Sequence, residues 1–179
     1  MPAKRLPLLT CAALALSGLA AGAAQAESPT IRATALAGLE RTDSAPGTGA
    51  ADGIYYGGQL GADWDLGGVQ LGVEGELGES TASALVGTNR ARQGVFASAA
   101  LRLAVPLTGQ LRVFARGGYA YHRISYDTGP DFSGSGYTLG AGAEADLSGP
   151  LFVRGEYRYS DYGSTVRGQQ FLGGVGLRF

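Results

Sequence analysis

The sequence contains little cysteine, methionine, histidine or charge for its length. Its 179 residues include one cysteine, one methionine and one histidine, and 16% are charged. A single cysteine excludes internal disulfides, and one histidine beside one cysteine gives little basis for a metal site. A formal net charge of −1 argues against a nucleic-acid partner. After residue 26 no apolar run reaches the roughly 18 residues that a transmembrane helix needs.

The first 26 residues have the features of an export signal. Lys4 and Arg5 precede an apolar stretch from Leu8 to Ala23, and residues 24–26 read Ala-Gln-Ala. This order of charge, apolar run and small-residue site predicts a signal peptide cleaved after residue 26. The mature chain, 27–179, then has twelve arginines and no lysine against fifteen acids, and it has lost Cys11. Cys11 follows too few apolar residues to predict a lipid anchor.

What the mature chain has in abundance is glycine and a period of two. The full sequence has 31 glycines, 29 of them in the mature chain, and they show no Gly-x-y repeat, which excludes collagen. From Val69 to Leu77, apolar and polar residues alternate, and only a strand separates two such sets onto two faces. The pattern predicts eight strands, near Thr30–Glu40, Ile54–Trp64, Val69–Gly78, Gln93–Val105, Leu111–Ser125, Tyr137–Leu147, Leu151–Ser160 and Gln170–Phe179.

The connections between these strands alternate between short and long. Three are short turns rich in Gly, Pro and Asp: Asp65–Gly68, Pro106–Gln110 and Ser148–Pro150. Four are longer and polar: Arg41–Gly53, Glu79–Arg92, Tyr126–Gly136 and Asp161–Gln169. This rhythm, with strand lengths suited to a tilted crossing, predicts an all-β fold: an eight-stranded antiparallel up-and-down transmembrane β-barrel with both termini on the short-turn rim.

One face of the predicted strands is almost free of charge, and the other holds seven acids and seven arginines. Glu40 lies near the long-loop end of the charged face, and glycines lie between the charges. A crowded lumen suits this mixture, because an arginine needs the space that a neighbouring glycine leaves. We therefore predict an interior salt-bridge network of Arg32, Asp63, Glu74, Glu76, Arg102, Arg112, Arg116, Glu144, Asp146, Arg154, Glu156, Arg158 and Arg178.

Charges of opposite sign fall on neighbouring strands, which predicts pairing across each ladder. Glu74 and Glu76 on the third strand would meet Arg102 on the fourth. Eight strands enclose a lumen that side chains just fill, so we predict a plugged polar core. The alternative is a narrow file of water between loosely paired charges.

Aromatic residues on the uncharged face fall into two groups. Seven lie toward the long-loop ends of the strands and two at the short-turn ends, as expected for the two aromatic girdles of a membrane barrel. The predicted girdle consists of Tyr56, Trp64, Tyr119, Tyr121, Tyr137, Tyr157, Tyr159, Phe171 and Phe179.

With these features the sequence resembles the small outer-membrane β-barrels of Gram-negative bacteria, the OmpA-type and opacity-protein-like barrels. The resemblance rests on the exported N-terminus, on residues 113–121 (VFARGGYAY) and 153–159 (VRGEYRY), and on the last strand ending in Phe179. It implies insertion into the outer membrane, with the terminal aromatic strand read by the barrel-assembly machinery. The chain lacks the periplasmic peptidoglycan-binding domain of full-length OmpA-type proteins, so the resemblance implies no wall-anchoring role.

Candidate chemistry is sparse. His122 would be the base of a lipid A-modifying enzyme, but Ser125 lies an odd number of positions away and so faces the other side of a regular strand. The simpler reading is a histidine at the rim, hydrogen-bonded to a loop. Arg90, Arg92, Arg123 and Arg167 are candidate contacts for lipopolysaccharide phosphates, or they simply keep the loop rim soluble.

The sequence therefore predicts an outer-membrane barrel with a structural or surface-interaction role, a plugged interior and displayed loops. Two alternatives stay open: a narrow porin-like channel for small solutes, and a lipid A-modifying enzyme. We expect no catalytic residues, no cofactor and no metal. The expected partners are outer-membrane lipid and lipopolysaccharide, and the expected state is a monomer.

Overall fold

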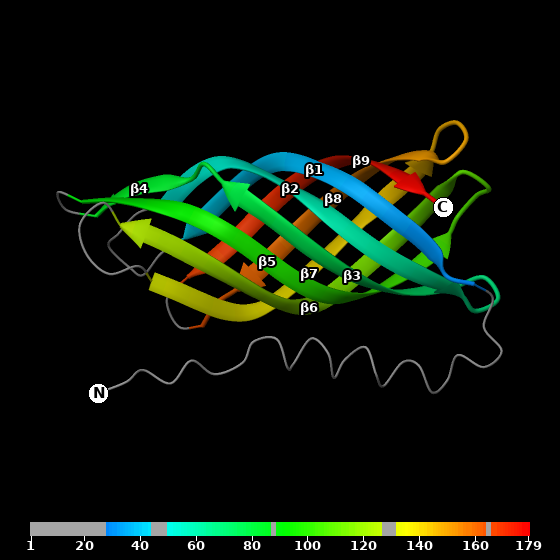
Figure 1. Ribbon diagram of the computed structural model, residues 1–179, viewed down its shortest axis with the longest axis horizontal. Helices are drawn as coiled ribbons and strands as arrows, with labels where there is room; N and C mark the ends of the chain where they lie inside the picture. The colour runs from blue at the N-terminus through cyan, green and yellow to red at the C-terminus, as the bar shows by residue number, and fades with distance from the viewer. Residues whose placement is uncertain (1–27, 44–49, 87–88, 127–131, 164–165) are drawn as a thin grey trace.

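Alternation of apolar and polar residues makes most of the described chain into long antiparallel strands (Figure 1). The computed structural model describes residues 28–43, 50–86, 89–126, 132–163 and 166–179. The predicted signal peptide lies outside them. The strands are β1 (Thr30–Asp43), β2 (Ala50–Asp65), β3 (Gln70–Ser80), β4 (Ser83–Val86), β5 (Asn89–Pro106), β6 (Leu111–Tyr126), β7 (Phe132–Asp146), β8 (Leu151–Asp161) and β9 (Arg167–Arg178).

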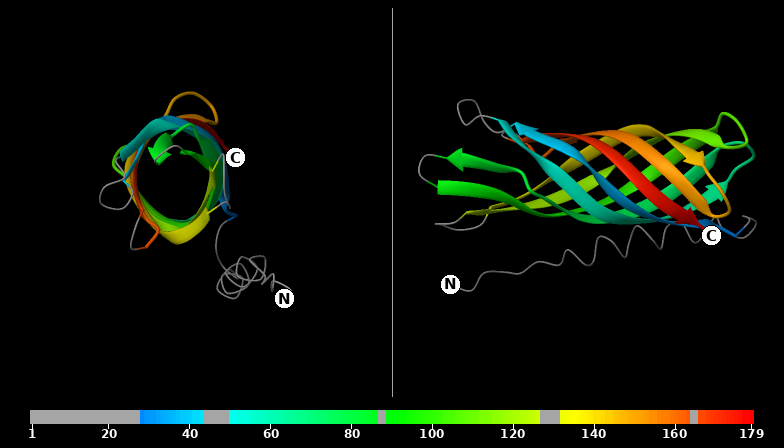
Figure 2. Two further views of the ribbon diagram at one scale, coloured as in Figure 1. Left: turned by 90° about the vertical axis from the view of Figure 1, so that its left-hand side faces the viewer. Right: turned by 90° about the horizontal axis from the view of Figure 1, so that it is seen from above.

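The sheet closes on itself into a barrel. Neighbours along the chain pair with each other, except that β3 and β4 both pair with β5, and β1 pairs with β9 over a long register from Arg32–Arg178 to Asp43–Arg167. The end-on view in Figure 2 shows the resulting ring of strands. The wall has eight strands, because β3 and β4 follow one another along the same strand, β5. The predicted eight-stranded antiparallel barrel is confirmed.

A short irregularity at Thr81 and Ala82 divides that wall strand into β3 and β4. Thr81 bonds to Ile54 of β2 through both its backbone N–H and its side-chain Oγ1, each at 2.9 Å, and the Ala82 N–H donates to the Ser80 hydroxyl. Side-chain hydroxyls that bond to nearby backbone groups compete with the regular ladder. The hairpin of β4 and β5 then continues beyond the rest of the rim (Figure 2).

The strands extend further into the long connections than the alternation predicts. β1 continues to Asp43, β2 begins at Ala50 and β7 begins at Phe132, all inside segments that we expected to be loops. These extensions consist mostly of small and polar residues and lack an apolar face. The backbone ladder holds them together outside the apolar band, so the hydrophobic pattern carries no signal for them.

The opposite rim carries tight turns and both described ends of the chain. The Leu66 N–H donates to the Val69 carbonyl at 2.8 Å, and Gly67 and Gly68 between them have φ of 83° and 99°. These backbone angles favour glycine, as the turn requires. Ile31 and Phe179 exchange two backbone hydrogen bonds at this rim, as predicted for an even strand count.

In the parts of the chain that the structure describes, no helix has the length and apolarity to cross a membrane.

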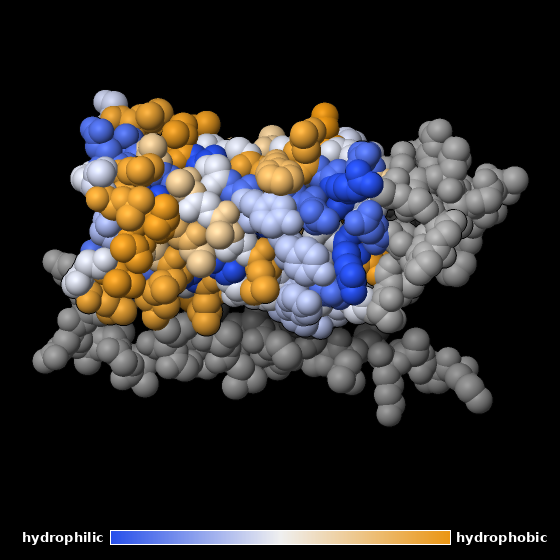
Figure 3. All heavy atoms as spheres, turned by 180° about the vertical axis from the view of Figure 1, so that it is seen from behind, coloured by the Kyte–Doolittle hydropathy of each residue, from blue (hydrophilic) through white to orange (hydrophobic). Residues whose placement is uncertain are grey.

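The outer surface of the barrel is apolar around its middle. Leu60, Leu101 and Leu139 each expose more than half of their surface, while the residues next to them in sequence point into the lumen. Figure 3 shows this apolar zone over the half nearer the short turns, and a more polar zone toward the long-loop rim. An exposed apolar face around a polar interior reverses the arrangement of a water-soluble domain.

Candidate functional site

The lumen contains ten buried charged side chains that sum to zero. Five arginines and five acids have 3% or less of their side chains exposed, and the strand alternation directs each one inward. They are Arg32 (β1), Asp63 (β2), Glu74 and Glu76 (β3), Arg102 (β5), Arg116 (β6), Glu144 (β7), and Arg154, Glu156 and Arg158 (β8).

Asp63 and Glu144 organise the part of this network nearer the short turns. The Asp63 carboxylate accepts from Arg32 Nε at 2.5 Å and from Arg102 Nη1 at 3.0 Å. Arg102 Nη2 lies 2.8 Å from a Glu144 oxygen, so Arg102 links acids on β2 and β7. Both carboxylates therefore face two guanidinium groups or more, a geometry that compensates for the loss of water.

Glu76 is the centre of the network nearer the long loops. Its two oxygens accept from Arg158 Nη1 and Nη2 at 2.7 and 2.8 Å and from Arg116 Nη1 at 2.9 Å. The hydroxyl of Tyr55 donates at 2.5 Å, and the amide of Gln59 donates at 3.1 Å. Five donors around one carboxylate strongly favour its charged form.

Arg116 and Arg154 connect the part of the network around Asp63 and Glu144 with the part around Glu76. Arg116 Nε lies 2.8 Å from Glu74, and its Nη1 lies 3.5 Å from Glu156. Arg154 contacts Glu156 at 2.6 Å and Glu144 at 3.5 Å.

The predicted pairing between neighbouring strands is wrong for Arg102. It contacts Asp63 and Glu144 instead of the acids on β3. Glu144 and Arg154 do pair directly across β7 and β8. The difference arises because the arginine side chain is long. An arginine that points into a narrow barrel contacts residues on strands across the lumen as easily as residues on the strand it pairs with.

Two phenylalanines that the charge pattern gives no reason to expect also lie inside. Phe114 packs under the guanidinium carbons of Arg154 and Arg102, at 4.1 and 4.9 Å from the ring centre, and Phe152 lies under Arg178 at 4.5 Å. Such contacts keep an arginine favourably placed away from water. The glycines of the inward face supply the room for them: an added Cβ at Gly142 would lie 2.8 Å from Phe114.

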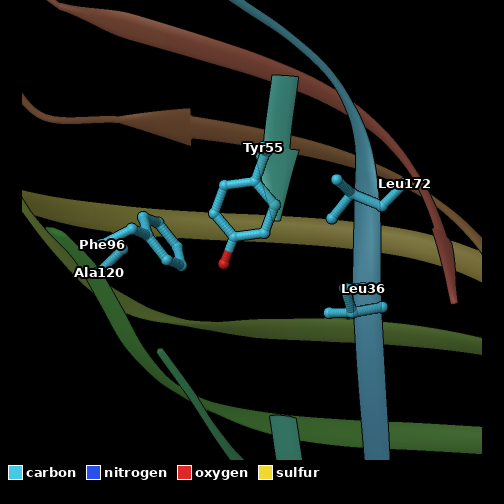
Figure 4. Packing of buried hydrophobic residues seen from close by; sticks show 5 residues of the cluster. All are labelled: Leu36, Tyr55, Phe96, Ala120 and Leu172. Carbon is cyan, nitrogen blue, oxygen red and sulfur yellow. The ribbon is translucent and has the colours of Figure 1, made fainter. Parts of the chain in front are cut away.

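The network ends at each rim in a different way. At the short-turn rim, Asp146 bonds to Arg178 and to Arg112, the latter at 2.5 Å, and all three are only partly buried. Toward the long loops, an apolar cluster from five strands follows the charges: Leu36, Tyr55, Phe96, Ala120 and Leu172 (Figure 4). Alternation predicted the inward charges and the inward position of Ala120, but Leu36, Tyr55, Phe96 and Leu172 were missed because they break the polar pattern.

His122 lies beyond this cluster, toward the long-loop rim where the sequence analysis expected it. His122 is 7% exposed, and its ring packs against Tyr162 with 4.1 Å between ring centres. Burial raises the pKa of Tyr162, which lies in the loop after β8. Glu40, Tyr55, Ser80 and Phe96 complete a small pocket here, with room for about one water molecule. The side chain of Ser125 lies outside the described residues.

The predicted girdle residues occupy the outer surface. Tyr56, Tyr119, Tyr137, Tyr157, Phe171 and Phe179 are exposed, and Trp64, Tyr121 and Tyr159 are half-buried. Of the predicted lipopolysaccharide contacts, Arg123 and Arg167 are exposed, and Arg167 Nε lies 3.5 Å from Asp161. The side chains of Arg90 and Arg92 lie outside the described residues.

Comparison with known proteins agrees with a barrel that has an apolar outer surface and a charged interior. Residues 11–179 match the model of a family described as the outer membrane protein beta-barrel domain. The chain belongs to this outer-membrane β-barrel family. It is located in the outer membrane of a Gram-negative bacterium, as the sequence predicted.

Curated relatives carry names of the same kind. The chain is 32% identical over 133 residues to the 31 kDa outer-membrane immunogenic protein of Brucella melitensis, covering 63% of this chain and 55% of that protein. It is 33% identical over 114 residues to a 22 kDa outer membrane protein of Rhizobium leguminosarum, covering 61% and 54%. The match thus spans about half the length of each relative.

Solved structures share the fold at low sequence identity. Ail of Yersinia pestis superposes with a TM-score of 0.62 at 14% identity, covering 86% of this chain and 99% of Ail. Neisserial surface protein A gives 0.62 at 16%, covering 86% and 99%. The N-terminal barrel domain of OprF from Pseudomonas aeruginosa gives 0.58 at 16%, covering 87% and 100%.

Proposed function

We propose that this protein is a structural and surface-interaction barrel whose lumen is closed to solutes, and that it acts through its outer surface and loops. The observation that carries the proposal is the neutral set of ten buried charges. Each arginine of this set contacts at least two carboxylates, so separating them leaves charges without partners in a site away from water. The apolar cluster around Phe96 adds a layer of buried apolar side chains on the long-loop side.

A porin-like channel is the first alternative. Ion passage would require Glu76 to exchange the three guanidinium bonds it accepts for bonds to water, and Tyr55 and Phe96 to move aside. Eight-stranded barrels have interiors of a size that side chains fill, which supports the closed state.

Conductance in planar bilayers tests this proposal. The folded protein should insert without producing a defined channel, since the network blocks the lumen. The double variant Arg158→Ser with Glu76→Ser removes one cation and one anion and should allow conductance if it folds. A steady, well-resolved conductance from the wild-type protein would contradict the proposal.

We also propose that the barrel is not an enzyme acting on lipid A. The His122 ring packs against Tyr162 at a tilt of 49° and is buried at the mouth of the lumen, away from the lipid-facing surface where a lipid substrate would lie. Lipid A from cells that overproduce the protein should keep the mass it has in control cells. A mass change that disappears in the His122→Ala variant would show that the enzyme alternative is right.

A further inference from the structure

We infer that the outer surface of β7, β8, β9 and β1 is a binding site for a phosphorylated glycolipid of the outer leaflet. The inference rests on the outer-membrane location and is independent of whether the lumen is closed. Three tiers of this surface carry it: a polar cluster near the rim, aromatic rings below it, and a shallow apolar groove at mid-height.

The polar tier is built around Asp161. One of its carboxylate oxygens accepts from the hydroxyls of Tyr137 at 3.4 Å and Tyr159 at 3.3 Å, and it lies 3.5 Å from Arg167 Nε. About two thirds of the Arg167 side chain is exposed, so its guanidinium also remains available to a phosphate. On the same strand as Asp161, the hydroxyl of Tyr157 donates to Gln169 of the adjacent strand β9 at 3.1 Å. A carboxylate, an amide and a guanidinium held side by side are suited to sugar hydroxyls and phosphate.

The aromatic tier lies between these polar groups and the apolar middle of the barrel. The rings of Tyr157 and Phe171 pack at 4.9 Å between centres, and those of Tyr137 and Tyr159 lie 6.4 Å apart. Amphipathic rings prefer the level of lipid headgroups, where one end is apolar and the other is wet. At the corresponding level, the described outward residues of β3 and β5 include Leu77 and Val95 but no aromatic residue. Outward aromatic residues thus lie on β2 and on β6 to β9, and the Tyr137–Tyr159 and Tyr157–Phe171 pairs belong to this surface.

The groove lies directly below Phe171. Ala35 and Ala37 of β1 and Gly173 and Val175 of β9 line it, and Gly173 pairs with Ala37 on one side and with Gly155 of β8 on the other. An added Cβ at Gly173 would touch only a carbonyl oxygen, at 3.9 Å. Small residues at this depth let an acyl chain approach the backbone closely. A ligand with a phosphorylated sugar head and acyl chains matches all three tiers at once.

Binding of purified lipid A to the folded barrel in detergent, measured by native mass spectrometry, tests the inference. Lipid A should bind at least tenfold more tightly than phosphatidylglycerol, which carries phosphate and acyl chains without the sugars. The double variant Tyr137→Leu with Tyr159→Leu and the single variant Gly173→Leu should each raise the Kd for lipid A about tenfold, equivalent to about 1.4 kcal/mol. The deacylated, bisphosphorylated disaccharide should bind more weakly and should be insensitive to Gly173→Leu.

Gly75→Leu is the matched control. Gly75 also faces outward at mid-height, on β3, and an added Cβ there meets no atom within 4 Å. This variant should change the Kd less than twofold. The mobility of unheated protein on gels checks that each variant is folded, and Arg167→Ser at the exposed rim tests the polar tier if the tyrosine variant does not fold. Equal affinity for the two lipids, equal loss in Gly75→Leu and Gly173→Leu, or unchanged binding in the folded polar-tier variants would overturn the inference.

Discussion

Replacing Arg116 by alanine should destabilise the folded barrel by about 3–5 kcal/mol, because it breaks a buried charge network from one side. The Arg116 guanidinium lies within 3.0 Å of both Glu74 and Glu76 and also donates to Ser98 at 3.1 Å. Without it, five acids face four arginines in the buried set, and a carboxylate is left short of donors where water is scarce. Equilibrium unfolding in urea, from liposomes or detergent, measures the loss.

Arg112→Ala is the control for this prediction. Arg112 also points inward from β6, but its side chain is partly exposed and its ion pair is to Asp146 at the short-turn rim. Water can replace that pair, so the expected loss is about 1 kcal/mol or less. Equal losses for Arg112→Ala and Arg116→Ala would mean that water reaches the middle of the lumen as easily as its rim.

Replacing Gly142 by valine should have the second large effect, a loss of folded protein. Gly142 faces the lumen from β7, and an added Cβ would lie 2.0 Å from the Gly155 carbonyl oxygen and 2.8 Å from the Phe114 ring. Neither the backbone of β8 nor a ring packed against two arginines has room to move. Overpacking of this kind costs about 1–3 kcal/mol, or more where the surroundings are rigid. The fraction of protein with folded mobility on unheated gels measures the effect.

The comparison for Gly142 is its near neighbour Gly155 on β8. Gly155 faces outward, and an added Cβ there meets no atom within 4 Å. Gly155→Val should therefore refold like the wild type, within about 0.5 kcal/mol. If both variants refold equally well, the inward glycines are not needed to make room for the side chains of the lumen.

Much of this architecture could be predicted from the sequence because a period of two fixes which side chains share a face. That rule placed Arg32, Asp63 and Glu76 in the lumen and Leu139 on the outside, and the turn glycines marked one rim. Alternation gives the side of the wall but not the partner across the lumen. The contact from Arg102 to Glu144 joins strands that are not neighbours, and no spacing along the chain encodes it.

Features that lack a pattern were missed. Tyr55 and Phe96 face inward among polar residues, because side chains must fill the volume of the lumen as well as balance its charge. A rule that assigns polar residues to the inward face does not predict them. The extensions of β1, β2 and β7 beyond the apolar band are held by backbone hydrogen bonds, for which side-chain periodicity carries no information. The cluster around Asp161 brings together β7, β8 and β9, so only the folded register reveals it.

The central claim is that apolar side chains face lipid while the charges are enclosed. Tryptophan quenching by lipids brominated on their acyl chains tests it most directly, using two adjacent residues of β6 in a Trp64→Phe background. Val113 is exposed on the outer surface, and Phe114 is 4% exposed inside the lumen. Val113→Trp should be strongly quenched in such vesicles, and Phe114→Trp only weakly. Equal or reversed quenching of the two tryptophans, or a folded protein that stays in solution without any detergent or lipid, would contradict the account.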